Sequence, residues 1–522
     1  MKKAKLYLGL GIFAVLLLVA ACQKDNKSNS GTPSVKTPKN WTSDEISQFV
    51  IKKIKADNTT FDWAKASDDM LFSALQNSDK MLAIGFKKAN ATDLETEQFN
   101  ATNNPDWKAA KDELVKIIIE SEQKANPSVD YTKFTIGSDF DNLNAFYVKI
   151  NGFETLQKLR QSPLVRYVYP SGFEPTSDDV TTRSSNGGSG CDGYAGENLT
   201  INTDYTQISP NAKQSWSYGQ PQIPQAWAST TGTGIGVMVI DAGVSSAQAM
   251  YQQANFASGA SSASRTVTLL SRLPSSVNFW GTQILAYDPS PYSTCGHGTA
   301  MTGIVASPRN NFGSNVGVAY NCNLISVRAL EDVVISNSKE ELGVAAALNL
   351  AVSRSDVKIV SMSNGSIFTR NVIGDAIKAV KNSGKLAFCA AGTSYSWLTW
   401  FGVVYPANMP EANAVTGVDQ NGNTCSDCHD GSEVDFVALM RRTTDGQSVL
   451  TLSTAGFLPA TVGGSSSATA TTAGIAALIW AKNPSQTGAQ VLAKMTTSGS
   501  NYPNKNSSRG WGIVNANAAS NF

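Results

Sequence analysis

Short apolar runs alternate with longer helical segments through the second half of the chain. The apolar runs predict strands, at 236–240, 323–329, 357–362, 386–390, 414–418 and 434–438. The segments between and after them predict helices, at 300–306, 341–353, 371–383, 466–482 and 487–495. Strands that alternate with helices favour parallel pairing. The pattern therefore predicts an α/β fold, a parallel sheet with helices on both faces.

The stretch from about 41 to 175 has a different pattern, in which helices and strands are mixed. Asn104-Pro105 starts a predicted helix whose apolar side chains, Trp107 among them, fall on one face. Strands are predicted at 81–86, 146–150 and 164–169, with a helix between the last two. This order predicts a small α+β domain ahead of the larger one.

Three other segments have the composition of a leader, a tether and a linker. Three lysines among the first five residues precede an apolar run that is too short for an ordinary membrane span and is typical of a secretion signal. A tract rich in Ser, Asn, Lys, Thr and Pro then predicts a flexible tether. The Ser/Gly run at 184–190 predicts an exposed, cleavable linker. The predicted plan is a signal peptide at 1–21, a tether at 22–40, an α+β domain at 41–175, a linker at 176–210 and an α/β domain at 211–522.

The balance of basic and acidic side chains gives no indication of a strongly charged partner. The 522 residues carry 42 basic and 41 acidic side chains, a formal net charge of +1. Because a chain so close to neutrality has no strong positive field, its charge implies neither nucleic acid nor an anionic membrane surface as a partner.

Side chains that could carry out catalysis lie in three segments, one at the end of a predicted strand and two at the start of predicted helices. The first strand ends in Asp241, at the edge where open α/β sheets bind ligands. His297 opens a helix of small residues, and the run 463–467, Gly-Gly-Ser-Ser-Ser, opens another. The helix start favours developing negative charge, and the glycines leave room for a substrate carbonyl. A nucleophile, a base and a carboxylate are the components of a catalytic triad, although the serine run alone would also suit a loop that caps a buried helix.

Taken together, these segments resemble the subtilisin-like serine peptidases (subtilases), and the resemblance extends over about 216–519. It implies a subtilisin-like fold and a peptide-bond hydrolase in which Ser466 is the nucleophile, His297 its base and Asp241 the carboxylate that orients the base. The chain has only two histidines, which strengthens the choice of His297. No cofactor is implied. Structural calcium occurs in the family, but no acidic loop here assigns a site for it.

The chain departs from the family pattern at supporting positions. Ala300 stands in place of a second histidine, and Ala470-Thr471 in place of a Pro-His pair. Thr393 occupies the position of the oxyanion-hole asparagine, so the resemblance implies an oxyanion site made of Thr393 and the Ser466 N–H. A hydroxyl has a shorter reach than a carboxamide, and losing one such donor typically costs about a hundred- to a thousandfold in turnover. We therefore expect a slow peptidase, with an inactive scaffold as the alternative.

Ser363, Asn364 and Gly365 lie in a segment that resembles the substrate-binding strand of the family. An unpaired strand edge binds extended peptides through main-chain hydrogen bonds, which favours unfolded or loop substrates. The aromatic stretch 395–405 stands where the family builds the floor of the specificity pocket. The first segment is also compatible with a strand that simply ends in a turn, and the second with a packed insertion.

The α+β domain resembles the inhibitory prosegment of subtilases, most closely over 143–172. The resemblance implies a zymogen that carries its own intramolecular inhibitor. We expect self-cleavage between about 173 and 198. An unrelated accessory domain is the alternative.

Val19-Ala20-Ala21-Cys22 resembles the lipobox of bacterial lipoproteins. It implies that Cys22 is lipidated and becomes the mature N-terminus. Gln23 follows where an aspartate would suggest retention at the inner membrane. We therefore expect an exported lipoprotein at the outer membrane or cell surface, with a plain signal peptide as the alternative.

Of the seven cysteines, six remain once Cys22 is assigned to the lipid. An even number in an exported chain permits up to three disulfides. We expect Cys295 to be bridged, with Cys322 as its favoured partner. The run 425–429, Cys-Ser-Asp-Cys-His, also matches the haem-attachment pattern, but its short loop has too little chain to wrap a haem. A tight-loop disulfide or free thiols are therefore favoured over haem or zinc.

The sequence thus predicts a secreted, lipid-anchored serine endopeptidase that is made as a zymogen and cleaves extended polypeptides. Two alternatives stay open: a binding scaffold with an inactive peptidase fold, and an enzyme that cleaves only itself or one dedicated partner.

Overall fold

A computed structural model describes residues 38–91, 104–128, 143–175, 190–191, 194–278, 284–393 and 401–522. The predicted signal peptide, Cys22 and most of the tether lie outside the described residues. The same holds for most of the Ser/Gly linker and for the first part of the aromatic stretch 395–405.

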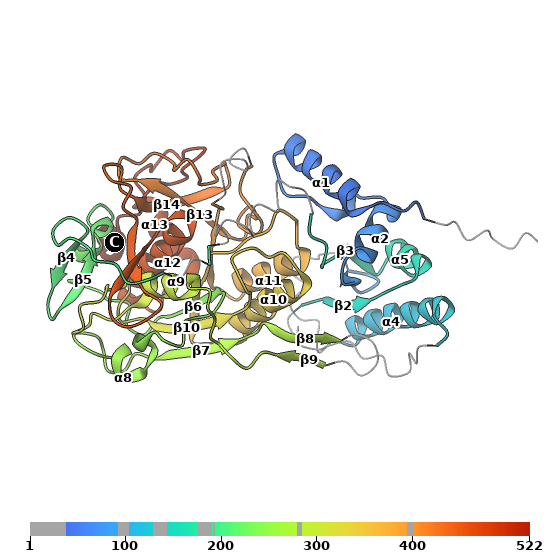
Figure 1. The fold of residues 1–522 in the computed structure, drawn as a ribbon, viewed down its shortest axis with the longest axis horizontal. Helices are drawn as coiled ribbons and strands as arrows, with labels where there is room; N and C mark the ends of the chain where they lie inside the picture. The colour runs from blue at the N-terminus through green and yellow to red at the C-terminus, as the bar shows by residue number, and fades with distance from the viewer. Residues whose placement is uncertain are drawn as a thin grey trace, which may run out of the picture. The chain divides into compact units, whose positions relative to one another are not determined.

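The larger domain is built on a seven-stranded sheet in which every neighbouring pair of strands is parallel (Figure 1). The strand order is β14-β13-β12-β11-β6-β10-β7. The strands are β6 (Gly236–Asp241), β7 (Val267–Ser271), β10 (Asn323–Arg328), β11 (Val357–Met362), β12 (Leu386–Ala390), β13 (Asn413–Asp419) and β14 (Val434–Arg441). The predicted α/β fold is confirmed. Only the edge strand β7 lacks a counterpart among the predicted strands of this sheet, because it is mostly half-buried and has no continuous apolar run.

Helices cover both faces of this sheet, each with its own core. They are α9 (His297–Ala306) and α12 (Gly464–Lys482) on one face, and α10 (Ser338–Ser353) and α11 (Asn371–Asn382) on the other. Val237 and Val239 of β6 pack into the core with α9 and α12, whereas Met238 and Ile240 pack into the core with α10 and α11. Because alternate side chains of a strand point to opposite faces, a strand between two cores is apolar at every position.

Helix α12 is buried along most of its length, as expected for a helix without a polar face. Its small residues allow close packing. A Cβ added at Gly474 would lie 2.7 Å from Val318 Cβ. The other helices of the domain are η4 (Trp216–Tyr218), α7 (Ile223–Ala226), η5 (Ala249–Tyr251), α8 (Gln253–Phe256), α13 (Gly488–Thr497) and α14 (Ala516–Asn521).

Small antiparallel hairpins complete the domain. They are β4 (Tyr205–Ile208) with β5 (Ala212–Ser215), β8 (Pro274–Asn278) with β9 (Ile284–Tyr287), and β15 (Val449–Leu452) with β16 (Pro459–Val462). Strand β4 falls inside the predicted linker 176–210. Nearby, Asp204 pairs with Arg442 at 2.6 Å, and Glu197 accepts hydrogen bonds from Thr461 at 2.7 and 2.8 Å. The folded body therefore begins upstream of residue 211, because distant polar partners hold a segment whose own composition is that of a loop.

The described residues between 38 and 175, here called the N-terminal unit, form an α+β arrangement around a three-stranded antiparallel sheet of order β2-β1-β3. Its elements are α1 (Ser43–Asp57), η1 (Trp63–Lys65), α2 (Asp68–Gln76), β1 (Met81–Phe86), α4 (Pro105–Ala125), β2 (Ala145–Lys149), α5 (Phe153–Gln161) and β3 (Val165–Pro170). The predicted strands and helices are present. Helices α1 and α2 are additional, and their capping residues Thr42 and Ser67 are sequence signals that would have found them.

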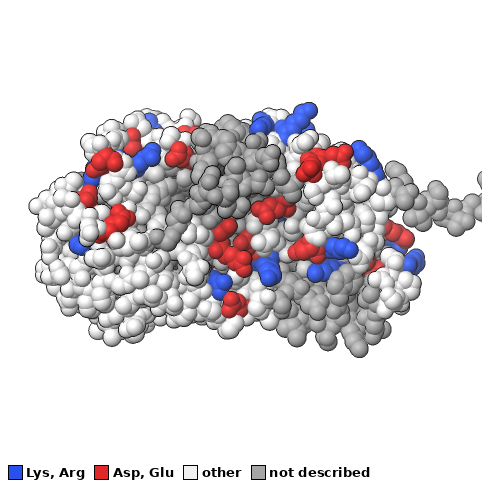
Figure 2. Space-filling model, in the orientation of Figure 1, with Lys and Arg blue, Asp and Glu red and all other residues white. Residues whose placement is uncertain are grey.

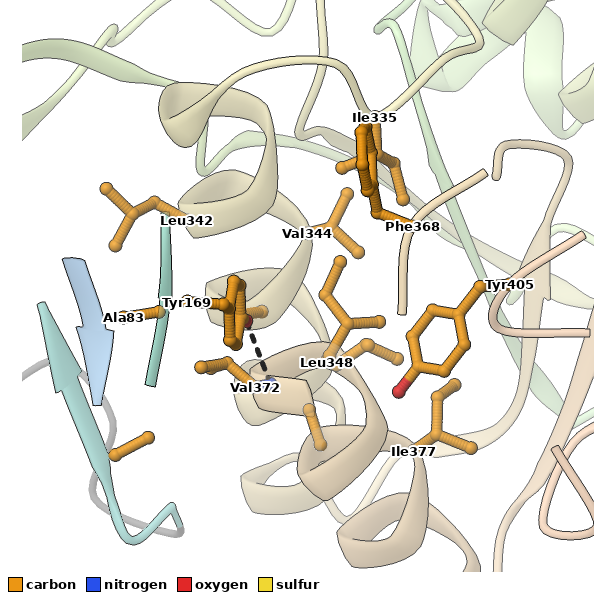
Figure 3. Close-up of a cluster of buried hydrophobic side chains, with 14 of the residues drawn as sticks. Ala83, Tyr169, Ile335, Leu342, Val344, Leu348, Phe368, Val372, Ile377 and Tyr405 are labelled. Atoms are coloured by element: carbon orange, nitrogen blue, oxygen red, sulfur yellow. Dashed lines mark hydrogen bonds between the residues drawn. The ribbon is translucent and has the colours of Figure 1, made fainter. Parts of the chain in front are cut away.

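The N-terminal unit packs against helices α10 and α11, and one hydrophobic core runs through all of them. Figure 3 shows Tyr169 of β3 beside α11, where its hydroxyl oxygen accepts the Val372 N–H at 3.2 Å. The same hydroxyl donates to Glu341 Oε1 at 2.5 Å. The two halves of the described chain are therefore joined by apolar packing with polar contacts buried inside it.

Acidic and basic side chains are intermixed in small groups on the face shown in Figure 2. This distribution agrees with the near-neutral net charge. Among the residues that the structure describes, no helix is both long and apolar enough to cross a membrane.

Candidate active site

Asp241 and His297 meet at the end of strand β6. His297 Nδ1 lies 2.9 Å from Asp241 Oδ1 and 3.0 Å from Oδ2. Asp241 is 1% exposed and His297 3% exposed, so the pair is shielded from solvent. The Ala242 N–H also donates to Asp241 Oδ1 at 2.8 Å, which fixes the carboxylate. A buried carboxylate bonded to Nδ1 leaves Nε2 as the ring nitrogen that can act as a base.

Close backbone packing brings α9 to this strand end. A Cβ at Gly298 would lie only 2.1 Å from the carbonyl oxygen of Gly243, so the first turn of α9 rests directly on the loop after β6. Gly243 has φ +87°, a conformation that favours glycine. Gly243 and Gly298 are therefore required by the geometry.

Ser466 lies in the first turn of α12, on the same cleft as His297. The cleft has a volume of about 670 Å³ and also contains Gly392, Thr393 and Gly464 in its lining. The described structure contains no Ser466–His297 hydrogen bond. Such catalytic bonds are often long without substrate and tighten in the complex, so the shared cleft is the relevant observation.

Thr393 also lines the cleft, in the loop that follows strand β12. Its Oγ1 accepts the backbone N–H of Ser465 at 2.8 Å and lies 2.9 Å from Ser465 Oγ. The hydroxyl predicted to face the oxyanion is thus also bonded to the residue that precedes Ser466.

Ser363, Asn364 and Gly365 all line the cleft, and the backbone of Gly365 is already paired with another segment. The Gly365 N–H donates to Val333 O at 3.2 Å, and its carbonyl accepts from Ile335 N at 2.9 Å. This corrects the expectation of an unpaired edge at Gly365, because a segment distant in sequence already occupies it.

The side chains of Ser363 and Asn364 hold parts of the site together. Ser363 Oγ donates to the carbonyl oxygen of Ser466 at 3.1 Å, and Asn364 Nδ2 donates to Ile240 O at 2.8 Å. These bonds link strand β11 to the start of α12 and to the end of β6.

A disulfide joins Cys191 to Cys295, two residues before His297. The predicted Cys295–Cys322 bridge is therefore wrong. Cys322 is instead a buried free thiol in the core beneath α9 and α12, and burial raises its pKa to about 11. No spacing rule could have found the real pair, because its partners are 104 residues apart.

The same disulfide brings an unexpected segment to the cleft. Gly190 and Tyr194 both line it, and the Tyr194 hydroxyl donates to Gly190 O at 3.0 Å. A Cβ at Gly190 would lie 3.7 Å from His297 Cδ2. The end of the predicted cleavable run thus lies beside the candidate base.

Cys425 and Cys428 form a second disulfide. Their sulfur atoms are bonded to each other, which argues against the haem attachment that the Cys-Ser-Asp-Cys-His run also matched. Cys428 pairs with Thr393 in an antiparallel bridge, and His429 N donates to Gly392 O at 2.9 Å. The disulfide loop therefore braces the backbone that carries Thr393.

Within the described ranges, no group of three or more His, Cys, Asp or Glu side chains is arranged to hold a metal ion. Structural calcium stays unassigned.

Comparison with known proteins indicates one family. The model of the Subtilase family matches residues 232–512, just over half of the chain. The alkaline elastase YaB of Bacillus sp. is 30% identical over 308 residues, which cover 58% of this chain and 69% of the elastase. Subtilisin Savinase of Lederbergia lenta is 28% identical over 305 residues, covering 58% of this chain and 97% of Savinase. Among solved structures, a protease of Pseudoalteromonas arctica is similar with 23% identity and a TM-score of 0.46, covering 59% and 96% of the two chains.

This chain belongs to the subtilase family. It is a serine-type endopeptidase with a subtilisin-like α/β fold.

Proposed function

We propose that Asp241, His297 and Ser466 are the catalytic triad of this endopeptidase, and that the protein is an inhibited, lipid-anchored precursor outside the cytoplasm. The proposed triad is supported by the buried Asp241–His297 hydrogen bond, which lies at a cleft that Ser466 also lines.

In this mechanism, His297 Nε2 takes the hydroxyl proton of Ser466 as the serine oxygen attacks the carbonyl carbon of the scissile peptide. Asp241 holds the Nδ1–H tautomer and stabilises the imidazolium. The oxyanion is held by the Ser466 N–H and the Thr393 hydroxyl. His297 then gives its proton to the leaving amine as the C–N bond breaks. Water, activated by the same base, finally hydrolyses the acyl-enzyme.

The test compares wild type with Ser466→Ala, using a fluorophosphonate probe and a casein digest. Wild type whose linker has been cut and whose N-terminal fragment has dissociated on dilution should label and digest casein. Ser466→Ala should do neither, with activity lower by a factor of at least about ten thousand. The control is Ser485→Ala, which changes an exposed serine near the end of α12 and should behave as wild type. Labelling that persists in Ser466→Ala would place the nucleophile elsewhere.

The zymogen proposal is supported by the contacts of the N-terminal unit with α10 and α11. Arg166 of β3 donates to both carboxylate oxygens of Asp375 at 2.8 Å, and Tyr167 donates to the same carboxylate at 2.7 Å. Gly190 in the cleft supports cleavage just upstream of it. In this proposal the enzyme cuts its own linker between about 173 and 198, so wild type should migrate as processed fragments and Ser466→Ala as the intact chain. Equal processing of both would mean that another protease makes the cut.

The lipid-anchor proposal is supported by the lysines, apolar run and Val19-Ala20-Ala21-Cys22 at the start of the chain. In this proposal Cys22 carries the lipid, and the protein is held at the outer membrane or cell surface. Membrane fractionation of Cys22→Ala should find the variant in the soluble fraction. Its retention on membranes would contradict a lipid on Cys22.

A restricted peptidase is the second candidate, because the backbone of Gly365 is already bonded to 333–335. Substrate must displace those bonds before it can pair with Gly365. A library of linear peptides separates the cases: an unrestricted enzyme cleaves many of its members, and a restricted one cleaves only its own linker or one partner.

A further inference from the structure

The hydroxyl of Thr393 has an unusual neighbour in Ser465, the residue before the proposed nucleophile. Thr393 Oγ1 accepts the Ser465 N–H and is 2.9 Å from the Ser465 hydroxyl. The Ser465 hydroxyl oxygen in turn accepts the Gly392 N–H at 3.3 Å. Two hydroxyls and two peptide N–H groups thus form one small network beside the cleft.

Burial decides which hydroxyl donates to the other. Ser465 is 1% exposed, and Thr393 Oγ1 is the acceptor within reach of its hydroxyl proton. Thr393 is exposed on the cleft, where water or substrate can accept its proton. A buried donor without an acceptor costs more than an exposed one, so the bond runs from Ser465 to Thr393.

Counting hydrogens then gives the direction of the Thr393 hydroxyl. A threonine oxygen has one proton and two lone pairs. The Ser465 N–H and the Ser465 hydroxyl occupy both lone pairs. The remaining proton of Thr393 must point away from Ser465, into the cleft.

We propose that Ser465 is a positioning residue, which turns the Thr393 hydroxyl so that it donates to the oxyanion beside the Ser466 N–H. The inference rests on the proposed triad and deepens it. A carboxamide carries its donors in a fixed plane, whereas a hydroxyl rotates, so a threonine in this place needs a neighbour that sets its rotation.

The backbone at Gly464 supports the same arrangement. Gly464 has φ +76°, and a Cβ there would lie 2.8 Å from Thr393 Oγ1. Only glycine lets the threonine hydroxyl approach the start of α12 this closely. The network therefore depends on residues from two segments, 392–393 and 464–465.

The experiment is a double-mutant cycle on the full chain after its linker has been cut and the N-terminal fragment has dissociated on dilution. kcat and KM for one chromogenic peptide are measured for wild type, Ser465→Ala, Thr393→Val and the double variant. We expect Thr393→Val to lower kcat by about a hundredfold or more. Ser465→Ala should lower kcat by about tenfold to a hundredfold, with KM changed by less than about twofold. The double variant should be no slower than Thr393→Val, because Ser465 acts through the threonine hydroxyl.

A matched pair separates the hydroxyl from the shape of the side chain. Ser465→Thr keeps the hydroxyl and should restore kcat to within about threefold of wild type, whereas the isosteric Ser465→Val should be as slow as Ser465→Ala. Thermal unfolding establishes that each variant is folded, and the Thr/Val pair replaces Ser465→Ala if the alanine variant is not.

Three results would overturn the proposal: normal kcat in Ser465→Ala, a loss confined to KM, or an equal loss of kcat with and without the Thr393 hydroxyl. A wild type that neither cleaves the peptide nor reacts with a fluorophosphonate would instead overturn the proposed function.

Discussion

Glu340 holds the loop that borders the candidate active site, and its carboxyl group is buried. The carboxylate accepts hydrogen bonds from the N–H and hydroxyl of Ser336, both at 2.9 Å, and from Glu331 N at 3.4 Å. The loop between these partners includes Val333, which lines the cleft. Burial is the main cause that raises the pKa of Glu340 to about 7, and the nearby Asp332 adds to it.

This raised pKa predicts a pH-dependent stability. The folded protein holds the Glu340 proton more tightly than the unfolded chain does, because the pKa of Glu340 in the unfolded chain is near 4.5. The resulting stabilisation is complete below pH 4.5 and is lost as the pH rises to about 7. Relative to Glu340→Gln, which does not titrate, wild type should lose up to about 3 kcal/mol of unfolding free energy across this range.

Urea unfolding of both proteins at pH 4.5, 6 and 8 measures the difference. Glu113→Gln, which changes an exposed carboxyl group on α4, controls for the loss of one charge. A wild-type-minus-variant difference that stays constant with pH would contradict the prediction.

At the residue scale, the sequence predicted the chemical groups better than their partners. The candidate triad of Asp241, His297 and Ser466 was predicted because three segments at element ends together resemble the subtilase motifs. The Ser465–Thr393 contact and the Cys191–Cys295 bridge could not be found. Both join segments far apart in the chain, and local pattern carries no information on such pairs.

At the scale of elements, the site depends on how closely helix α9 approaches strand β6. Gly298 lies where α9 touches the loop after β6. The two backbones are so close there that no space is left for a side chain. A methyl group there would overlap the Gly243 carbonyl, at 2.1 Å, and would reach within 3.2 Å of Asp241 Oδ1. The small residue next to His297 therefore sets the distance between base and carboxylate.

Gly298→Ala should lower peptidase activity by about a hundredfold or more, because it pushes His297 away from Asp241. Fluorophosphonate labelling rates and circular dichroism of the same samples measure reactivity and folding separately. Gly219→Ala is the matched control, since a Cβ at Gly219 meets nothing within 4 Å. Equal labelling rates for Gly298→Ala and the control would contradict this account of the helix contact.

Most strands of the central sheet were predictable because both faces are buried, and such strands are rich in apolar residues. Edge strand β7 was not, since its residues are mostly half-buried. The backbone pairing of Gly365 with 333–335 also escaped prediction. Which partner occupies a strand edge depends on loops that reach it from elsewhere in the chain.

At the scale of the whole molecule, the N-terminal unit and the α/β domain share buried polar contacts as well as a core. Glu341 of α10 is fully buried and accepts hydrogen bonds from Tyr147 at 2.8 Å and from Arg370 at 2.7 Å. Arg166 and Asp375 form a bidentate pair whose side chains are 11% and 6% exposed. Breaking one partner of such a pair leaves a buried charge, so these contacts favour a unit that stays bound after the linker is cut.

Asp375→Ala should weaken this attachment. Truncating one side of a buried ion pair costs about 2–5 kcal/mol, which corresponds to at least about thirtyfold in affinity. In protein with a cut linker, the N-terminal fragment should leave the catalytic fragment faster, as measured by gel filtration and by the rise of peptidase activity on dilution. Asp356→Ala removes an exposed carboxylate that binds Arg354 at 3.0 Å and serves as the control. Identical fragment release in the two variants would mean that apolar packing alone holds the unit.

The sequence by itself determined the α/β architecture, the α+β pattern ahead of it and the candidate triad. These follow from apolar periodicity, from glycines at element ends and from the order of a few side chains, all of which are local properties. Only the tertiary structure decided what covers the Gly365 edge, which cysteines pair, and that Ser465 meets Thr393. Such contacts form between segments that are distant in the sequence. The residues next to each partner in the chain do not indicate which distant segment it will contact.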